Sequence, residues 1–283
     1  MVRFDSSWAP LHSVLLHRPV EPLSDADAEA WGYPAGRDAA RCDTEFAGFA
    51  ALLAAEGVDV HIDERPTGVD AVYACDPLIP TPFGPIVGRM RKPLRQPENR
   101  AAAAHLARLG VTPFGRLDRG HVEGGDVVWL DATSAIIGIG TRSDHAGAAA
   151  LEALIAPRGA TLRRIELPWR DGPDVCLHMR SLLNIVDANL AVVLRPWMPT
   201  AALQWLEQRG LRLLDAVAEE YDTQGNNLLV LRPGVVAMVA GNPRSVAMLN
   251  AAGVEVHTFA GDELCIKGTG GPTCLCFDLW RAD

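Results

Sequence analysis

Hydrophobic and polar positions along the chain repeat one unit. A stretch rich in alanine and leucine, with helical character, runs to a glycine, and a short strand-like run follows it directly. Each glycine stands where a helix commonly ends in a residue with positive φ. The unit occurs at residues 46–62, 100–114, 148–165, 201–214 and 244–257, with its glycines at positions 57, 110, 159, 210 and 253.

The spacing of these glycines, roughly fifty residues, bears on the architecture. Five α/β units at a near-constant period are the pattern of a closed, pseudo-symmetric ring of repeats. An ordinary alternating α/β sheet also has helices that end in glycine before strands, so the period alone leaves both arrangements open. Both belong to the α/β class.

Further strands are predicted between these units, several of them continuously apolar, as strands covered on both faces are. The segment 21–40 contains acids, prolines and glycines without periodicity, and it is either a lid or a surface loop without a role. No linker divides the chain, so we expect residues 1–283 to form a single domain. The further strands lie at residues 14–17, 71–74, 126–130, 134–138, 176–186, 190–194, 228–231, 235–239 and 273–279.

The composition is that of a folded protein with a large core, since 48% of the residues are apolar and 22% are charged. The net charge of −9 argues against nucleic acid or an anionic membrane surface as the main partner, and it is compatible with a small cationic ligand. No apolar run has the length of a membrane span, and Asp5 stands where a secretory signal has its apolar stretch. Six cysteines without a Cys-x-x-Cys pair indicate reduced thiols, so we expect a cytoplasmic protein.

The most unusual local sequence is Lys267-Gly-Thr-Gly-Gly-Pro-Thr-Cys274. Its order differs from that of a phosphate-binding loop, and it precedes the predicted strand at 273–279 rather than a helix. The glycines allow a close backbone approach to a ligand and leave the Cys274 sulfur at the edge of that strand. The alternative, a small buried hydrophobic residue, applies to most single cysteines. Cys276 is expected to point to the opposite face of the strand.

Three other positions carry side chains suited to acid–base chemistry. Glu123-Gly-Gly-Asp126 forms a turn at the start of a strand, where rigid backbone can present a carboxylate; a plain turn with solvated acids is the alternative. His178 lies in an apolar stretch, where a single histidine is commonly a satisfied core residue. Asp76 directly follows a predicted strand. Taken singly, none of these positions decides the function.

The sequence gives little support for a bound metal or cofactor. No two of its eight histidines have His-x-x-x-His spacing. The segment Gly138-Ile-Gly140 departs from the dinucleotide-binding fingerprint, because Ser143 stands where the third glycine belongs. We therefore expect neither a metal nor a cofactor.

Taken in order, these segments resemble the guanidino-group-modifying enzymes of the pentein superfamily: arginine deiminases, dimethylarginine dimethylaminohydrolases and amidinotransferases. The resemblance covers nearly the whole chain, and its specific elements are Glu-Gly-Gly-Asp, the histidine and the C-terminal Gly-Gly-x-x-Cys. It implies a five-bladed α/β propeller, in agreement with the ring that the glycine period suggested. The matching segments are His17-Arg18-Pro19, Asp76-Pro77, Pro93-Leu94-Arg95, Glu123 to Asp126, Arg142 to Gly147, His178 and Gly270 to Cys274.

The resemblance also implies the catalytic roles. Cys274 corresponds to the nucleophile, His178 to the general acid/base and Glu123 to its carboxylate partner. A guanidinium stays cationic at physiological pH, carboxylates can hold its planar fork, and a thiolate is a suitable attacker on its central carbon. We expect the empty site's acids to raise the pKa of the Cys274 thiol and the arriving cation to offset them, so that the substrate activates its own nucleophile.

Five further residues are predicted to bind substrate. By resemblance, Asp76 corresponds to a carboxylate that grips the guanidinium, and Arg95 and Arg142 to arginines that hold the substrate's α-carboxylate; solvated arginines are the alternative for these two. Asp126 and Arg180 complete the set. Arg180 departs from the His-x-Asp pattern of deiminases and amidinotransferases, and a cation there is closer to the lysine of the dimethylarginine hydrolases.

The residues on either side of Asp76 combine features of two branches of the family. Cys75 stands where the dimethylarginine hydrolases have an acid, and Asp76-Pro77 is closer to the deiminases. The predicted function is hydrolysis of the guanidino group of arginine or an N-substituted arginine, with dimethylarginine favoured. An arginine deiminase or an amidinotransferase is the alternative, and a non-catalytic guanidine-binding or ribosome-associated pentein is an alternative of another class. The expected partner is a small guanidino compound, and a homodimer is left open.

Overall fold

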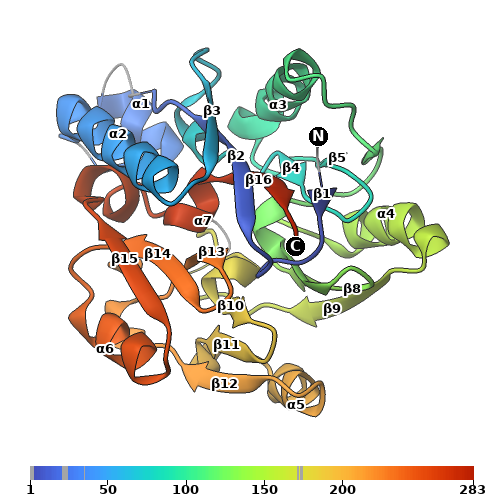
Figure 1. Cartoon of the computed structure of the whole chain (residues 1–283). Helices are drawn as coiled ribbons and strands as arrows, with labels where there is room; N and C mark the ends of the chain where they lie inside the picture. The colour runs from blue at the N-terminus through green and yellow to red at the C-terminus, as the bar shows by residue number, and fades with distance from the viewer. Residues whose placement is uncertain (1–2, 21–24, 35, 171, 173–174) are drawn as a thin grey trace.

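A computed structural model of the chain describes all residues except 1–2, 21–24, 35, 171 and 173–174. Within these described residues the strands form five small sheets set around a common centre, with the longer helices on the outside (Figure 1). In four sheets the first strand pairs antiparallel with the second, and the second pairs parallel with the third. These sheets consist of β4 (Leu78–Ile79), β5 (Ile86–Val87) and β6 (Gly115–Arg116); β7 (Val127–Asp131), β8 (Ser134–Ile139) and β9 (Thr161–Glu166); β10 (Leu183–Asp187), β11 (Leu190–Val193) and β12 (Arg212–Asp215); and β13 (Leu229–Arg232), β14 (Val235–Val239) and β15 (Glu255–Phe259).

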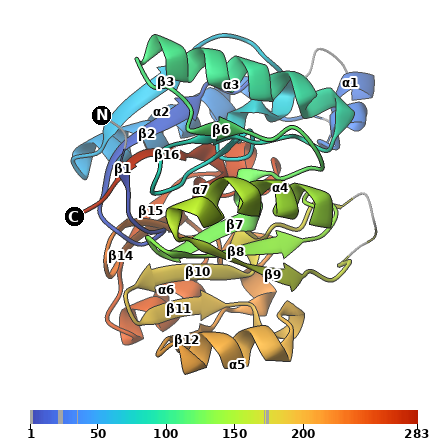
Figure 2. The same ribbon diagram turned by 90° about the vertical axis from the view of Figure 1, so that its right-hand side faces the viewer.

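The fifth sheet joins the two ends of the chain. Its order is β1 (Arg3–Phe4), β16 (Phe277–Arg281), β2 (Leu11–His17) and β3 (Asp59–Asp63). The C-terminal strand β16 pairs antiparallel with β2, so it takes the place that the first strand has in the other sheets. Figures 1 and 2 show both termini beside this sheet. The five-bladed ring predicted from the sequence is therefore confirmed, and one continuous sheet is not what the chain forms.

Five outer helices end where the glycines predicted. The residues Gly57, Gly110, Gly159, Gly210 and Gly253 all have φ between +71° and +87°. This left-handed conformation is accessible to glycine at little cost, and it turns the chain from the helix into the next strand. No helix in the described part of the chain combines the length and the apolar character that crossing a bilayer requires. The helices are α2 (Ala39–Ala55), α3 (Gln96–Arg108), α4 (His145–Ile155), α5 (Thr200–Gln208) and α6 (Pro243–Ala251).

Four of the predicted strands are wrong in part, and three of these lie next to site residues. Residues 71–74 form no strand, and Ala71 and Val72 belong to a 3₁₀ helix (Val69–Val72). The predicted strand at 176–186 begins only at Leu183, after a 3₁₀ turn at Met179–Ser181. Cys274 lies in a single helical turn, α7 (Pro272–Leu275), before β16. Residues 111–114 form no strand. Buried apolar turns and buried strands have the same apolar character, so hydrophobicity could not distinguish them.

The described part of the predicted lid segment contacts the core. Within it, α1 (Asp25–Trp31) precedes Tyr33, which is buried and has its hydroxyl 3.4 Å from that of Tyr73. The Lys92 ammonium donates to the Trp31 carbonyl over 2.7 Å. Residues 21–24 and 35 of the predicted segment lie outside the described residues. A lid role stays a prediction.

The closure of the ring contains a buried ion pair. Arg281 is 1% exposed, and its Nε donates to Asp278 over 2.9 Å. Its Nη1 donates to the carbonyls of Ala9 and Val230, both over 2.8 Å, so one guanidinium ties β16 to the N-terminal segment and to β13. Removing it leaves a buried carboxylate without its cation.

Arg281→Met is therefore expected to lower the free energy of unfolding by about 3–5 kcal/mol. Urea denaturation followed by circular dichroism measures this difference. The control is Arg3→Met, which removes an exposed ion pair with Asp5 worth less than about 1 kcal/mol. Equal effects of the two substitutions would show that the Arg281 contacts do not stabilise the ring.

Candidate active site

The candidate site is assembled from one position in each blade. Asp76 precedes β4, Glu123 precedes β7, His178 precedes β10, Asn227 precedes β13 and Cys274 precedes β16. Each residue therefore lies just before the first strand of its sheet. The contacts below show that the ring brings these starts together, although the residues are far apart in sequence.

His178 lies between two buried carboxylates. Its Nε2 is 3.2 Å from Oε2 of Glu123, and its Nδ1 is 3.7 Å from Oδ1 of Asp76. Burial lowers the pKa of the imidazole, but the charges of Cys176, Asp126 and Asp76 outweigh burial and raise that pKa well above its usual value. The raised pKa favours the protonated imidazolium, the form that can donate a proton.

The Cys274 sulfur faces hydrogen-bond donors. The side-chain N–H of Asn227 donates to Sγ over 3.4 Å, while Asn227 Oδ1 is fixed by the backbone N–H and the hydroxyl of Thr273, at 3.0 and 2.8 Å. The pKa of Cys274 is lowered to about 6, first by a hydrogen bond from the Cys75 thiol and also by the His178 charge and Asn227, against burial and Asp76. The sequence predicted a raised pKa for Cys274. Asp76 does raise it, but the net shift is downward, so that prediction is wrong.

Asp76 is held by a buried arginine. Its Oδ2 accepts from Arg95 Nη1 over 2.8 Å. Burial raises the pKa of Asp76, but the charges of His178 and Arg95 outweigh it and lower that pKa to about 2. Arg95 also donates to Glu98 over 2.8–3.1 Å and to the Asp70 carbonyl over 3.2 Å. Because so many of its donors are occupied, the contacts describe Arg95 as a support for Asp76; its predicted role with a substrate carboxylate stays a prediction.

Glu123 is fixed from three sides. The backbone N–H of Arg91 donates to its Oε1 over 3.1 Å, and Arg142 Nη1 lies 3.3 Å from Oε2, the oxygen that also faces His178. Burial raises the pKa of Glu123, but the hydrogen bond with His178 and the charge of Arg142 outweigh burial. The pKa is therefore lowered, and the carboxylate stays ionised. Arg142 therefore lies beside the imidazole–carboxylate pair, and its predicted role with a substrate carboxylate stays a prediction.

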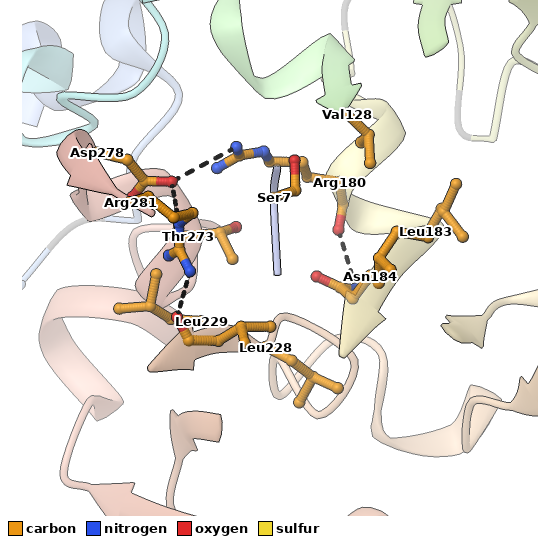
Figure 3. Close-up of a pocket in the computed structure, with 12 residues that line it drawn as sticks. Ser7, Val128, Arg180, Leu183, Asn184, Leu228, Leu229, Thr273, Asp278 and Arg281 are labelled. Atoms are coloured by element: carbon orange, nitrogen blue, oxygen red, sulfur yellow. Dashed lines mark hydrogen bonds and ion pairs between the residues drawn. The ribbon is translucent and has the colours of Figure 1, made fainter. Parts of the chain in front are cut away.

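The two remaining predicted residues lie behind this group. Asp126 is buried, and its oxygens accept from the Met179 N–H over 3.0 Å and the Ser143 hydroxyl over 2.6 Å, so it holds the backbone next to His178. Arg180 extends toward Asp278, with the closest atoms 4.0 Å apart, and lines a cavity of about 20 Å³ (Figure 3). That volume admits a single water rather than a substrate, so direct substrate binding by either residue stays a prediction.

Asn227 was missed by the sequence analysis. A signal was present, because it stands just before a first strand, as Asp76, His178 and Cys274 do, at the same spacing of roughly fifty residues. An asparagine next to an apolar strand does not by itself indicate a hydrogen bond to the sulfur of a distant cysteine. The contact depends on tertiary structure alone.

Among the described residues, Asp76, Glu123 and His178 offer ligand atoms within 4.8 Å of one another, a spacing that a cation can use. Arg95 and Arg142 already neutralise the two carboxylates, and a metal-bound histidine has to be neutral, whereas His178 holds its proton strongly. We therefore interpret the three residues as an acid–base group rather than a metal site.

Comparison with known proteins agrees with this geometry. Solved structures with the same fold include dimethylarginine dimethylaminohydrolase from Pseudomonas aeruginosa complexed with citrulline (TM-score 0.75, 20% identity, 95% of this chain and 99% of that one). Another is SxtG, an amidinotransferase from Microseira wollei (TM-score 0.79, 16% identity, 100% and 98%). The fold is thus that of the pentein guanidino-group-modifying enzymes.

The family follows from the sequence match. The arginine deiminase family model matches residues 69–210 and 197–281, and the chain belongs to that family. Curated relatives include the arginine deiminases of Rhodococcus erythropolis (31% identity over 190 residues, 56% of this chain and 46% of the relative) and Lactococcus lactis subsp. lactis (26% over 258 residues, 76% and 62%). The matches therefore span about half to three-fifths of the length of these relatives.

Gly125 packs directly against the side chains of His178 and Asp76. A Cβ at this position would lie 2.5 Å from Nδ1 of His178 and 2.9 Å from Oδ1 of Asp76. Gly125→Ala should push the imidazole away from its carboxylates, so the raised pKa of His178 should fall toward the ordinary histidine value. Titration of the histidine NMR signals measures this pKa. Gly48→Ala in α2, where a Cβ meets open space, is the control that should leave it unchanged; an unaltered His178 pKa in Gly125→Ala contradicts the geometry.

Proposed function

We propose that the protein is a cysteine-dependent hydrolase that removes an amine from the guanidino group of arginine or an N-substituted arginine. The observation that carries the proposal is the position of His178, with its raised pKa, between the buried carboxylates of Asp76 and Glu123. Cys274, with its lowered pKa, is joined to this group through its carbonyl, which accepts from the backbone N–H of Cys75, the residue before Asp76. A thiolate, a proton donor and anions for a planar cation are the components that attack on a guanidinium requires.

The reaction follows from these roles. The carboxylates hold the guanidinium, and the Cys274 thiolate forms a bond to its central carbon. His178 gives its proton to the departing amine as the carbon–nitrogen bond breaks, which leaves an S-alkylthiouronium on Cys274. The neutral imidazole then takes a proton from water, and the resulting hydroxide adds to the same carbon. The carbon–sulfur bond breaks, the Cys274 thiolate leaves, and the hydroxyl proton of the adduct passes to solvent. The product is a ureido compound.

The favoured substrate is Nω,Nω-dimethylarginine, giving citrulline and dimethylamine. Arg180 supports this choice, since it places a cation where deiminases and amidinotransferases have a second guanidinium-binding acid. The dimethylargininase structure is also matched over nearly its whole length, whereas the match to the Rhodococcus arginine deiminase spans under half of that protein. Free arginine is the second candidate, because the family model and the curated relatives are those of arginine deiminases.

A panel of guanidino compounds tests the proposal. Arginine, monomethylarginine, dimethylarginine and agmatine are incubated with the protein, with and without glycine as an acceptor amine, and ureido product and released amine are quantified. We expect dimethylarginine to be turned over with the highest kcat/KM and Cys274→Ala to lose at least about 1,000-fold in rate. Cys42→Ala, which removes a buried thiol from α2, is the matched control. Turnover by Cys274→Ala, or amidine transfer to glycine, refutes the hydrolase.

The pH dependence of kcat/KM follows from the two opposed pKa shifts. The rate should fall below about pH 6, where the Cys274 thiolate becomes protonated, and again at alkaline pH, where His178 loses the proton it must donate. Asp126→Asn removes a negative charge that raises the pKa of His178, so it should move the alkaline limb to lower pH. An acid limb above pH 8, near the ordinary cysteine pKa, would contradict a preformed thiolate.

A further inference from the structure

The turn that leads to Cys274 packs against a single tyrosine from another blade. Tyr73 is 7% exposed, and its hydroxyl donates to the carbonyl of Gly268. Burial raises the pKa of Tyr73 well above its usual value, so the hydroxyl keeps the proton that it donates. The ring lies against Gly270, where a Cβ would be 2.5 Å from Cε1 of Tyr73. The tyrosine side chain therefore contacts the turn on both sides of Thr269.

The backbone of this turn is in an unfavourable conformation at Thr269, whose φ is +62°. A β-branched residue adopts this left-handed conformation only where the surrounding contacts impose it. Within the C-terminal segment itself, the N–H of Gly270 donates to the carbonyl of Cys265 over 3.0 Å. Tyr73 adds a hydrogen bond on one side of Thr269 and a packing contact on the other. These contacts together hold the turn in its conformation.

The backbone of the same tyrosine contacts the proposed guanidinium-binding acid. The carbonyl of Tyr73 accepts from the backbone N–H of Asp76 over 3.1 Å. Between these two residues, the N–H of Cys75 donates to the carbonyl of Cys274 over 3.2 Å. Residues 73–76 thus contact residues 268–274 at two places, through the Tyr73 side chain and the Cys75 backbone. The separation between the Asp76 carboxylate and the Cys274 sulfur depends on these contacts.

We propose that Tyr73 is a positioning residue, whose hydroxyl fixes the turn before Cys274 and so sets where the sulfur lies relative to a guanidinium held by Asp76. The inference rests on the proposed function in taking Cys274 as the attacking group and Asp76 as a binding acid. Attack requires the two reacting atoms at about 3–3.5 Å with their orbitals aligned, so a small displacement of the sulfur slows the reaction. Asp76 keeps its own hydrogen bond from Arg95, so loss of the hydroxyl should move the sulfur and leave the acid in place.

Kinetics of Tyr73→Phe test this role, because the variant keeps the ring against Gly270 and removes only the hydroxyl. With the best guanidino substrate, we expect kcat to fall about 10- to 100-fold and KM to stay within about threefold, since the guanidinium is still held while the sulfur is displaced. Tyr33→Phe is the matched control. It removes a neighbouring buried hydroxyl that donates to Tyr73 over 3.4 Å rather than to the turn, and it should leave kcat nearly unchanged. An unchanged kcat in Tyr73→Phe, or an equal loss in Tyr33→Phe, overturns the inference.

The strain at Thr269 offers a rescue. Glycine adopts a positive φ at little cost, so Thr269→Gly should let the turn keep its conformation without the tyrosine hydroxyl. We therefore expect the double variant Tyr73→Phe/Thr269→Gly to recover part of the kcat that Tyr73→Phe loses. A loss that is equally large in both backgrounds contradicts a turn held in place by Tyr73.

Hydrogen exchange without substrate separates this inference from the proposed function. Deuterium uptake by the backbone amides of residues 267–276 is followed by mass spectrometry. We expect Tyr73→Phe to speed exchange in this segment about tenfold, as loss of one buried hydrogen bond implies. An unchanged exchange rate overturns the inference, whether or not the protein turns over a guanidino compound. Faster exchange in a protein that turns over none of these compounds leaves the contact with the turn standing and refutes the proposed function instead.

Discussion

The site depends on one geometric constraint, the convergence at the centre of the ring of the segments that precede the first strand of each blade. Each segment is held by its own small sheet, so the side chain that it presents has little freedom to move. Five blades each contribute one residue. His178 lies 3.7 and 3.2 Å from Asp76 and Glu123, and Asn227 lies 3.4 Å from Cys274. The β16–β2 pairing closes this arrangement, because it joins the blade that carries Cys274 to the start of the chain.

Burial makes the charges at this centre strongly dependent on one another. Desolvation alone would neutralise each of them, yet Asp76 and Glu123 stay ionised because arginines and His178 face them. His178 in turn keeps its proton because of the surrounding anions. The Cys274 thiolate is stabilised by neutral donors and the imidazolium, against the field of Asp76. The site thus has the charge distribution that the proposed attack on a guanidinium needs.

The repeat was predictable because glycine at a helix end is a local requirement, and all five positions have the positive φ that the pattern predicted. The main site residues could be identified from the family resemblance because each lies in a short local motif. What depends on tertiary contacts was not predictable. The helical turn at Cys274 resembled a strand, and Asn227 carried no local signal for sulfur contact. The sign of the Cys274 pKa shift was missed because its decisive neighbour, Cys75, is almost two hundred residues away.

The covalent intermediate is the most direct test of the central claim. Dimethylarginine is mixed with the protein, the reaction is stopped in acid within milliseconds to seconds, and intact-protein and peptide masses are recorded. We expect a fraction of the chain to carry the added mass of the thiouronium on Cys274, formed and lost at rates compatible with turnover. Product formation with no adduct on Cys274 at any time, or an adduct on another residue, would contradict the proposed nucleophile.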